Sequence, residues 1–175
     1  MRSQTNDFPA SNVIYWRSSR ALLVQFALLA AVALLPSACH LMRAPVQLLL
    51  PMHWPVLLAG LMYGPEAGLA VGICAPLVSF ALSGMPPAGT LPFMLPEIAA
   101  YGFVAGLCRS NLKLGGWLSV LAAVLAGRAV YALLTAACCG VPGIKAVLIA
   151  GLPVAGLQVI LLPPLAAKAV KLAGK

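Results

Sequence analysis

The sequence predicts an all-α integral membrane protein with six transmembrane helices and cytoplasmic N- and C-termini. Of its 175 residues, 62% are hydrophobic and only 8% are charged, which is more apolar surface than a soluble domain of this size can bury. Pro and Gly interrupt long apolar runs at intervals, as expected for helices joined by short turns. Lys and Arg gather at the ends of these runs, a distribution typical of membrane helices.

The apolar runs divide the chain into three parts. Residues 1–20 form a polar cytoplasmic leader, residues 21–167 a single six-helix membrane domain, and residues 168–175 a basic cytoplasmic tail. A helix needs about 20 residues to cross the hydrocarbon layer, so the short second run requires part of the apolar approach before it, with five helices as the alternative. The predicted spans are residues 21–42, 51–63, 67–84, 92–109, 116–139 and 145–166.

The basic residues are distributed unevenly over the predicted connections. With six spans both termini lie on one side, which holds eight Lys and Arg residues, whereas the other side holds only Arg43 and Lys145. Because cytoplasmic loops carry the excess of positive charge, we expect both termini in the cytoplasm of a multi-pass protein of the inner (plasma) membrane. The connection around Met85 then lies outside.

Composition and motifs argue against several functions. The net charge of +8 comes from loop residues and not from a basic face with aromatic side chains, so no nucleic-acid partner is expected. The five cysteines show neither a CxxC pair nor zinc-ligand spacing, so no metal or cofactor is expected. Nucleophile-elbow, phosphate-loop and HExxH motifs are missing, which predicts a non-catalytic membrane subunit without catalytic residues.

Two charged residues fall well inside the predicted spans. Glu97 lies in the fourth span with Tyr101 four residues later, on the same helix face. Arg128 lies near the middle of the fifth span. Each charge is costly to bury alone, so the two residues either form an ion pair or face a polar cavity. A structural ion pair and contact with a ligand are both open.

Two polar residues in other spans are further candidates. His53 begins the second span beside Trp54, where a histidine either belongs to the interfacial belt or binds a ligand. Gln158 lies in the middle of the sixth span, where its amide needs a partner.

Small residues recur four positions apart on several spans. The pairs Gly60 with Gly64, Gly68 with Gly72 and Gly102 with Gly106 lie on one helix face each, and we interpret them as intramolecular packing positions. Ala27 and Ala31 belong to an Ala-rich surface of the first span, which either packs internally or docks another membrane protein.

Residues 47–110 contain an ordered series of motifs. The chain reads MHWPVLLAGLMYGPEAGLAVGICAPLVSFALSGMPP and then MLPEIAAYGFVAGL. This series resembles the substrate-binding S components of energy-coupling factor (ECF) vitamin transporters. The resemblance covers roughly a third of the chain, and the remaining spans are similar only in number and hydrophobicity.

The resemblance implies a binding subunit that captures a small vitamin or related micronutrient at the outer face for ATP-driven uptake. Its implied partners are a transmembrane coupling subunit, which Ala27 and Ala31 would contact, and two ATP-binding cassette ATPases. The predicted substrate-binding residues combine motif positions with the two polar residues chosen for their depth in the membrane. They are His53, Met85, Glu97, Tyr101, Arg128 and Gln158.

The substrate is open at this stage. Arg128 would suit a carboxylate-bearing vitamin such as pantothenate, but this preference disappears if Glu97 neutralises it. Corrinoids, nicotinate and thiamin precursors are other candidates. The alternative function is a non-transporting membrane scaffold or regulatory subunit, in which Glu97 and Arg128 form a closed pair without a cavity.

Overall fold

The computed structural model describes residues 19–41, 52–139 and 142–173. These residues form six α-helices and a π-helical turn, η1 (Leu107–Asn111), that extends α5, and they contain no strand. The predicted all-α class and the count of six helices are therefore confirmed for the described residues. The helices are α1 (Ser19–Leu41), α3 (His53–Tyr63), α4 (Pro65–Ser83), α5 (Leu91–Gly106), α6 (Gly116–Cys139) and α7 (Pro142–Ala173).

Glycine and proline set the ends of the central helices. Gly64 ends α3 with a φ of 90°, which glycine adopts without strain, and Pro65 begins α4. Gly84 ends α4 in the left-handed conformation, with φ 69°, and its N–H donates to the carbonyl of Phe80. The helix boundaries predicted at these positions are thus the boundaries seen in the structure.

The last helix is longer than predicted. Its span was expected to end at residue 166, but α7 continues to Ala173 and contains Pro163 and Pro164. Each proline removes one helical hydrogen bond, and the helix nevertheless continues past both. The apolar approach to α3, residues 46–50, lies outside the described residues.

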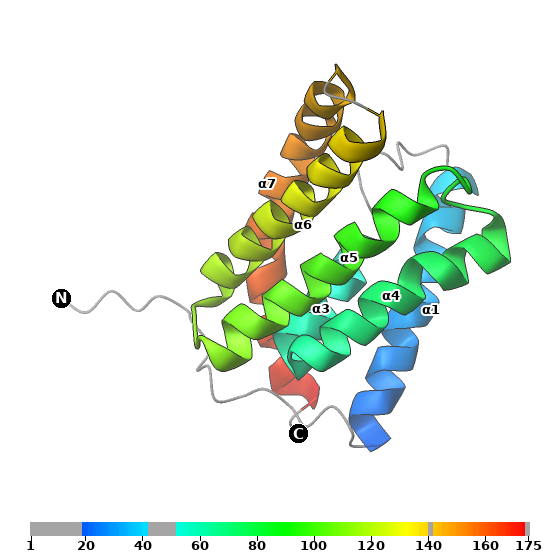
Figure 1. Cartoon of the computed structure of the whole chain (residues 1–175). Helices are drawn as coiled ribbons and strands as arrows, with labels where there is room; N and C mark the ends of the chain where they lie inside the picture. Colours follow the sequence, from blue (N-terminus) through cyan, green and yellow to red (C-terminus); the bar gives the residue numbers. More distant parts are fainter. Residues whose placement is uncertain (1–18, 42–51, 140–141, 174–175) are drawn as a thin grey trace.

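The helices pack into one bundle with α3 inside it. Figure 1 shows α4 and α5 in front of α3, α1 beside α4, and α6 and α7 on the other flank. Nine of the eleven residues of α3 are buried, since it contacts α1, α4, α5, α6 and α7. One apolar core joins α3 to α6 and α7, and a second joins α3 to α1 and α4.

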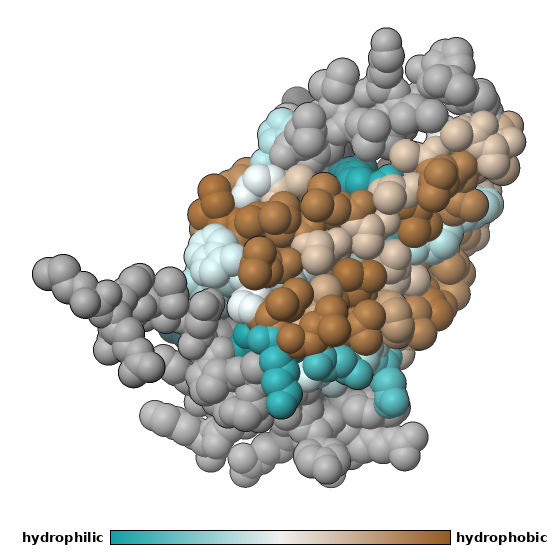
Figure 2. Space-filling view, turned by 60° about the vertical axis from the view of Figure 1, so that its left-hand side comes forward, coloured by the Kyte–Doolittle hydropathy of each residue, from teal (hydrophilic) through white to brown (hydrophobic). Residues whose placement is uncertain are grey.

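The outer surface of the bundle is apolar. Three segments are long and apolar enough to cross a membrane, namely Pro65–Ser83, Leu91–Asn111 and Gly116–Cys138, and Leu22–Val32 and Ala155–Val170 are shorter apolar helical stretches. Figure 2 shows a broad hydrophobic band over one face, with hydrophilic residues along its lower margin. Such a surface would be unfavourable in water, so the chain is an integral membrane protein.

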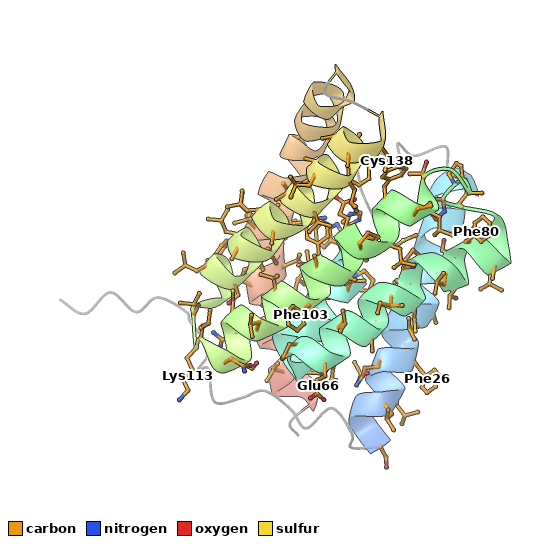
Figure 3. The ribbon with its side chains drawn as sticks, viewed as in Figure 1. Phe26, Glu66, Phe80, Phe103, Lys113 and Cys138 are labelled. Atoms are coloured by element: carbon orange, nitrogen blue, oxygen red, sulfur yellow. The ribbon has the colours of Figure 1, made fainter. Side chains whose placement is uncertain are left out.

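The two ends of the bundle differ. The start of α1 and the end of α7 lie at the same end, as predicted for six crossings (Figure 1). Glu66 and Lys113 lie at this end, and Cys138 lies at the opposite one (Figure 3). We call the first the terminal end and the second, which includes the α4–α5 connection, the far end.

Glycines bring α3, α4 and α5 into backbone contact. A Cβ added at Gly60 or Gly68 would overlap the carbonyl oxygen of Gly102, and one added at Gly106 would overlap the backbone of Gly64. Only glycine lets helices approach this closely. The interpretation of the glycine pairs as intramolecular packing positions is confirmed.

Candidate functional site

The candidate site is built around a buried ion pair between α5 and α6. Nη1 of Arg128 lies 3.4 Å from Oε1 of Glu97, and the two side chains are 17% and 4% exposed. The hydroxyl of Tyr101 donates a hydrogen bond to the same oxygen at 3.2 Å. Of the arrangements that the sequence left open, the structure has the direct ion pair, with the predicted neighbour Tyr101 bonded to it.

The ring of Tyr101 joins this pair to α3. Its centroid lies 5.0 Å from that of His53, with the rings at 70° in an edge-to-face arrangement, a favourable geometry for two aromatic groups. His53 is 1% exposed, so its interpretation as a residue of the interfacial belt is wrong. The structure therefore brings together four of the predicted site residues, which we call the Glu97 cluster: His53, Glu97, Tyr101 and Arg128.

One residue that positions the cluster was missed in the sequence. A Cβ at Gly127 would lie 3.0 Å from three carbons of the Tyr101 ring, so the ring packs directly on the backbone of α6. The available signal was a glycine directly before Arg128 in a run of larger apolar residues.

The contact between α5 and α6 continues toward the far end as an aromatic pair. The rings of Phe93 and Tyr131 lie 6.3 Å apart, one helical turn beyond Glu97 and Arg128 respectively. Glu97 falls in the first third of the segment Leu91–Asn111, on the side of the α4–α5 connection. The Glu97 cluster is thus nearer the far end than the terminal end.

The two other predicted site residues make no polar contact with this cluster. Met85 lies on the α4–α5 connection and is 38% exposed. Gln158 on α7 is 2% exposed, and its Nε2 has no hydrogen-bond partner among the described residues. A buried polar group without a partner costs about 1–3 kcal/mol, so the amide of Gln158 destabilises the bundle unless another group meets it.

A further buried cation lies on the other side of the membrane domain. Arg109 in η1 is 1% exposed, and its Nη1 donates to the carbonyl of Leu114 at 2.8 Å. The sequence predicted a loop charge here, but Lys113 adopts a left-handed φ of 53°, and the chain turns back so that Leu114 meets the guanidinium. Arg109 holds the α5–α6 connection together.

Metal ligands are not grouped in the described part of the chain. Within it, no set of three or more His, Cys, Asp or Glu side chains could hold a metal ion. Cys74, Cys108 and Cys138 are free thiols.

Comparison with protein families identifies the bundle. Residues 21–169 match the model of the ECF transporter, substrate-specific component. The chain belongs to this family. The match extends over all six helices, so the ECF substrate-specific (S) component is recognised well beyond the motifs of residues 47–110. No curated protein and no solved structure matches the chain.

Membership of the family settles the general role of the protein. An S component is the substrate-specific subunit of an ECF transporter, and its family implies a partnership with transmembrane and ATPase components of that transporter. The resemblance inferred from the ordered motifs is confirmed. In this S component the Glu97 cluster is the candidate for contact with substrate.

Proposed function

We propose that this S component captures a small vitamin or related micronutrient at the outer face of the plasma membrane for ATP-driven uptake. The observation that supports this most is the match of residues 21–169 to the ECF transporter substrate-specific component. The Glu97–Arg128 ion pair, buried with Tyr101 and His53 in an apolar bundle, indicates where the substrate would bind. Apolar residues of similar volume often stabilise a protein as well as a buried ion pair does. Ionisable groups inside a membrane domain are therefore a sign of function.

The position of the cluster favours entry of the ligand from outside. Lys113 lies at the terminal end (Figure 3), and the excess of basic residues near that end assigns it to the cytoplasm. The far end, with the α4–α5 connection and Met85, then faces outward. We infer that this connection closes over the ligand, whose polar atoms contact the Glu97 cluster and the amide of Gln158.

The first test is a thermal-shift screen of the detergent-purified protein against water-soluble vitamins. A ligand at 100 times its Kd should stabilise the protein by about 2.7 kcal/mol. The shift given by the ligand of the wild type should be smaller in Glu97→Gln and unchanged in Glu66→Gln, a matched control because Glu66 is an exposed carboxylate in the first turn of α4. If no vitamin stabilises the wild type, the scaffold alternative replaces the proposed function.

The proposed docking surface for the coupling subunit is the outer face of α1. Val32 faces the bundle and is fully buried, whereas Ala27 is exposed and Ala31 is half-buried. Phe26 is 68% exposed and points outward from α1 (Figure 3). Small side chains on an exposed helix face permit close helix–helix contact, which supports docking at Ala27 and Ala31.

Ala27→Trp is expected to weaken association with the coupling subunit by about tenfold or more, equivalent to at least about 1.4 kcal/mol. The bulky ring would hold the two helices apart, while the Glu97 cluster is untouched. Co-purification with the coupling subunit and two ATPases measures the loss, and the vitamin-induced thermal shift should be unchanged. Leu133→Trp is the control, since Leu133 is 70% exposed on α6. Equal losses in both variants would contradict docking through α1.

In the proposed cycle ATP is hydrolysed by the partner ATPases and not by this subunit. Hydrolysis would tilt the S component in the membrane and carry the ligand inward. The apolar lateral surface (Figure 2) supports this step, because tilting it exposes few polar groups to lipid.

A further inference from the structure

We propose that the substrate of this S component is an uncharged molecule. The inference rests on the proposed function, because it concerns the ligand of the Glu97 cluster. It starts from the charge balance of that cluster. Glu97 contributes one negative charge and Arg128 one positive charge, and the two are in direct contact at 3.4 Å.

The charge balance of the cluster is not changed by other residues near it. Arg109 is the other charged residue of the segment Leu91–Asn111, and it lies in η1, about 18 Å along the helix from Glu97. The sequence has no Asp, Glu, Lys or Arg besides Glu97 between residues 67 and 108, none besides Arg128 between 114 and 144, and none at all between 146 and 167. Glu66 is exposed and lies at the terminal end (Figure 3). The ligand therefore meets a pair whose charges cancel.

One carboxylate oxygen of Glu97 is engaged twice. Its Oε1 accepts the hydrogen bond from Tyr101 and faces the guanidinium of Arg128, and the side chain is only 4% exposed. A cationic ligand next to this carboxylate would also lie close to Arg128, which repels it. The cluster consequently gives little binding energy to a cation.

Arg128 is less completely engaged. A guanidinium has five N–H donors, and among the described residues the polar contact of Arg128 is the one to Glu97. At 17% exposure it can still donate to a carbonyl, a ring nitrogen or a hydroxyl of a ligand. An anion would gain from these donors but would place a second negative charge next to Glu97, in a site where removing an ion from water costs several kcal/mol. A neutral acceptor obtains the hydrogen bonds without that cost.

The test compares acid and amide or alcohol forms of the same vitamin by thermal shift. The pairs are nicotinate with nicotinamide, pantothenate with pantothenol, and biotin with its amide, and thiamin, riboflavin and pyridoxine complete the panel. The uncharged member of the stabilising pair should bind at least about tenfold more tightly than the acid, or a neutral vitamin alone should stabilise. Tighter binding of the acid, or stabilisation by thiamin alone, would overturn the inference.

Glu97→Gln supplies the second arm of the experiment. This variant leaves Arg128 without its counter-charge, so the order within the stabilising pair should invert in favour of the acid, while Glu66→Gln keeps the wild-type order. An unchanged order in Glu97→Gln would contradict the inference, and if the variant does not fold, the wild-type comparison decides alone. If no vitamin of the panel stabilises the wild type, the proposed function itself is contradicted. If a charged vitamin stabilises it best, only the inference about the charge of the substrate is contradicted.

Discussion

Gly102→Val is expected to prevent the protein from reaching a stable folded state. A Cβ at this position overlaps the carbonyl oxygen of Gly68 and lies 2.9 Å from Cγ1 of Val56. Overpacking against movable side chains costs about 1–3 kcal/mol, and here the main obstacle is the backbone of a packed helix, so the loss should exceed that range. The yield of monodisperse protein in detergent and its thermal midpoint measure the effect.

The control for this substitution is Gly156→Ala. Gly156 is also helical, in α7, but an added Cβ would meet nothing within 4 Å. Replacing glycine by alanine in a helix is favourable by about 1 kcal/mol, so this variant should be at least as stable as the wild type. If Gly102→Val kept the wild-type midpoint, the close contact of α3, α4 and α5 would be refuted.

Removing one member of the Glu97–Arg128 pair should be the second large effect. Glu97→Gln or Arg128→Met leaves a buried charge without its partner, which costs about 3–5 kcal/mol. The double variant removes both charges and should recover much of this loss, because no unpaired ion is left behind. Thermal unfolding of the four proteins in one detergent, without ligand, gives the coupling energy. Strictly additive losses would show that the two side chains do not interact.

The positions of the helices were predictable because of how the apolar runs are interrupted. Gly64 and Gly84 both adopt positive φ, and Pro65 begins a helix, so the residues that mark breaks in the sequence mark them in the structure. The end of α7 was predicted at residue 166, and it was missed because no Gly or Pro separates that residue from Ala173. Pro163 and Pro164 lie inside both the predicted span and the helix. Proline in a membrane helix is tolerated where its surroundings compensate for the lost hydrogen bond.

Which face of each helix points inward was harder to predict than where each helix begins and ends. An amphipathic helix shows its inward face by its apolar stripe, but the spans of this protein are apolar on all sides. Only glycine pairs and isolated charges marked a face, and these markers correctly indicated the contacts of Gly60 and Gly102 and the proximity of Glu97 and Tyr101.

Contacts that depend on helix rotation were not visible in the sequence. The burial of His53 against Tyr101, the packing of that ring on Gly127 and the burial of Arg109 all depend on it. Periodicity carries no information about such rotation. The ligand-binding roles of all six predicted site residues stay predictions.

The glycine contacts of α3, α4 and α5 also limit how the subunit can move. No layer of side chains separates these helices at Gly60, Gly68 and Gly102, so one cannot slide past another without carbonyl oxygens colliding with α-carbons. The three helices therefore act as a single rigid body. Any relative movement must therefore involve the parts attached to this body, which are α1, the α4–α5 connection and the pair α6 and α7. The Glu97–Arg128 contact, which joins α5 to α6, lies at the edge of this rigid body.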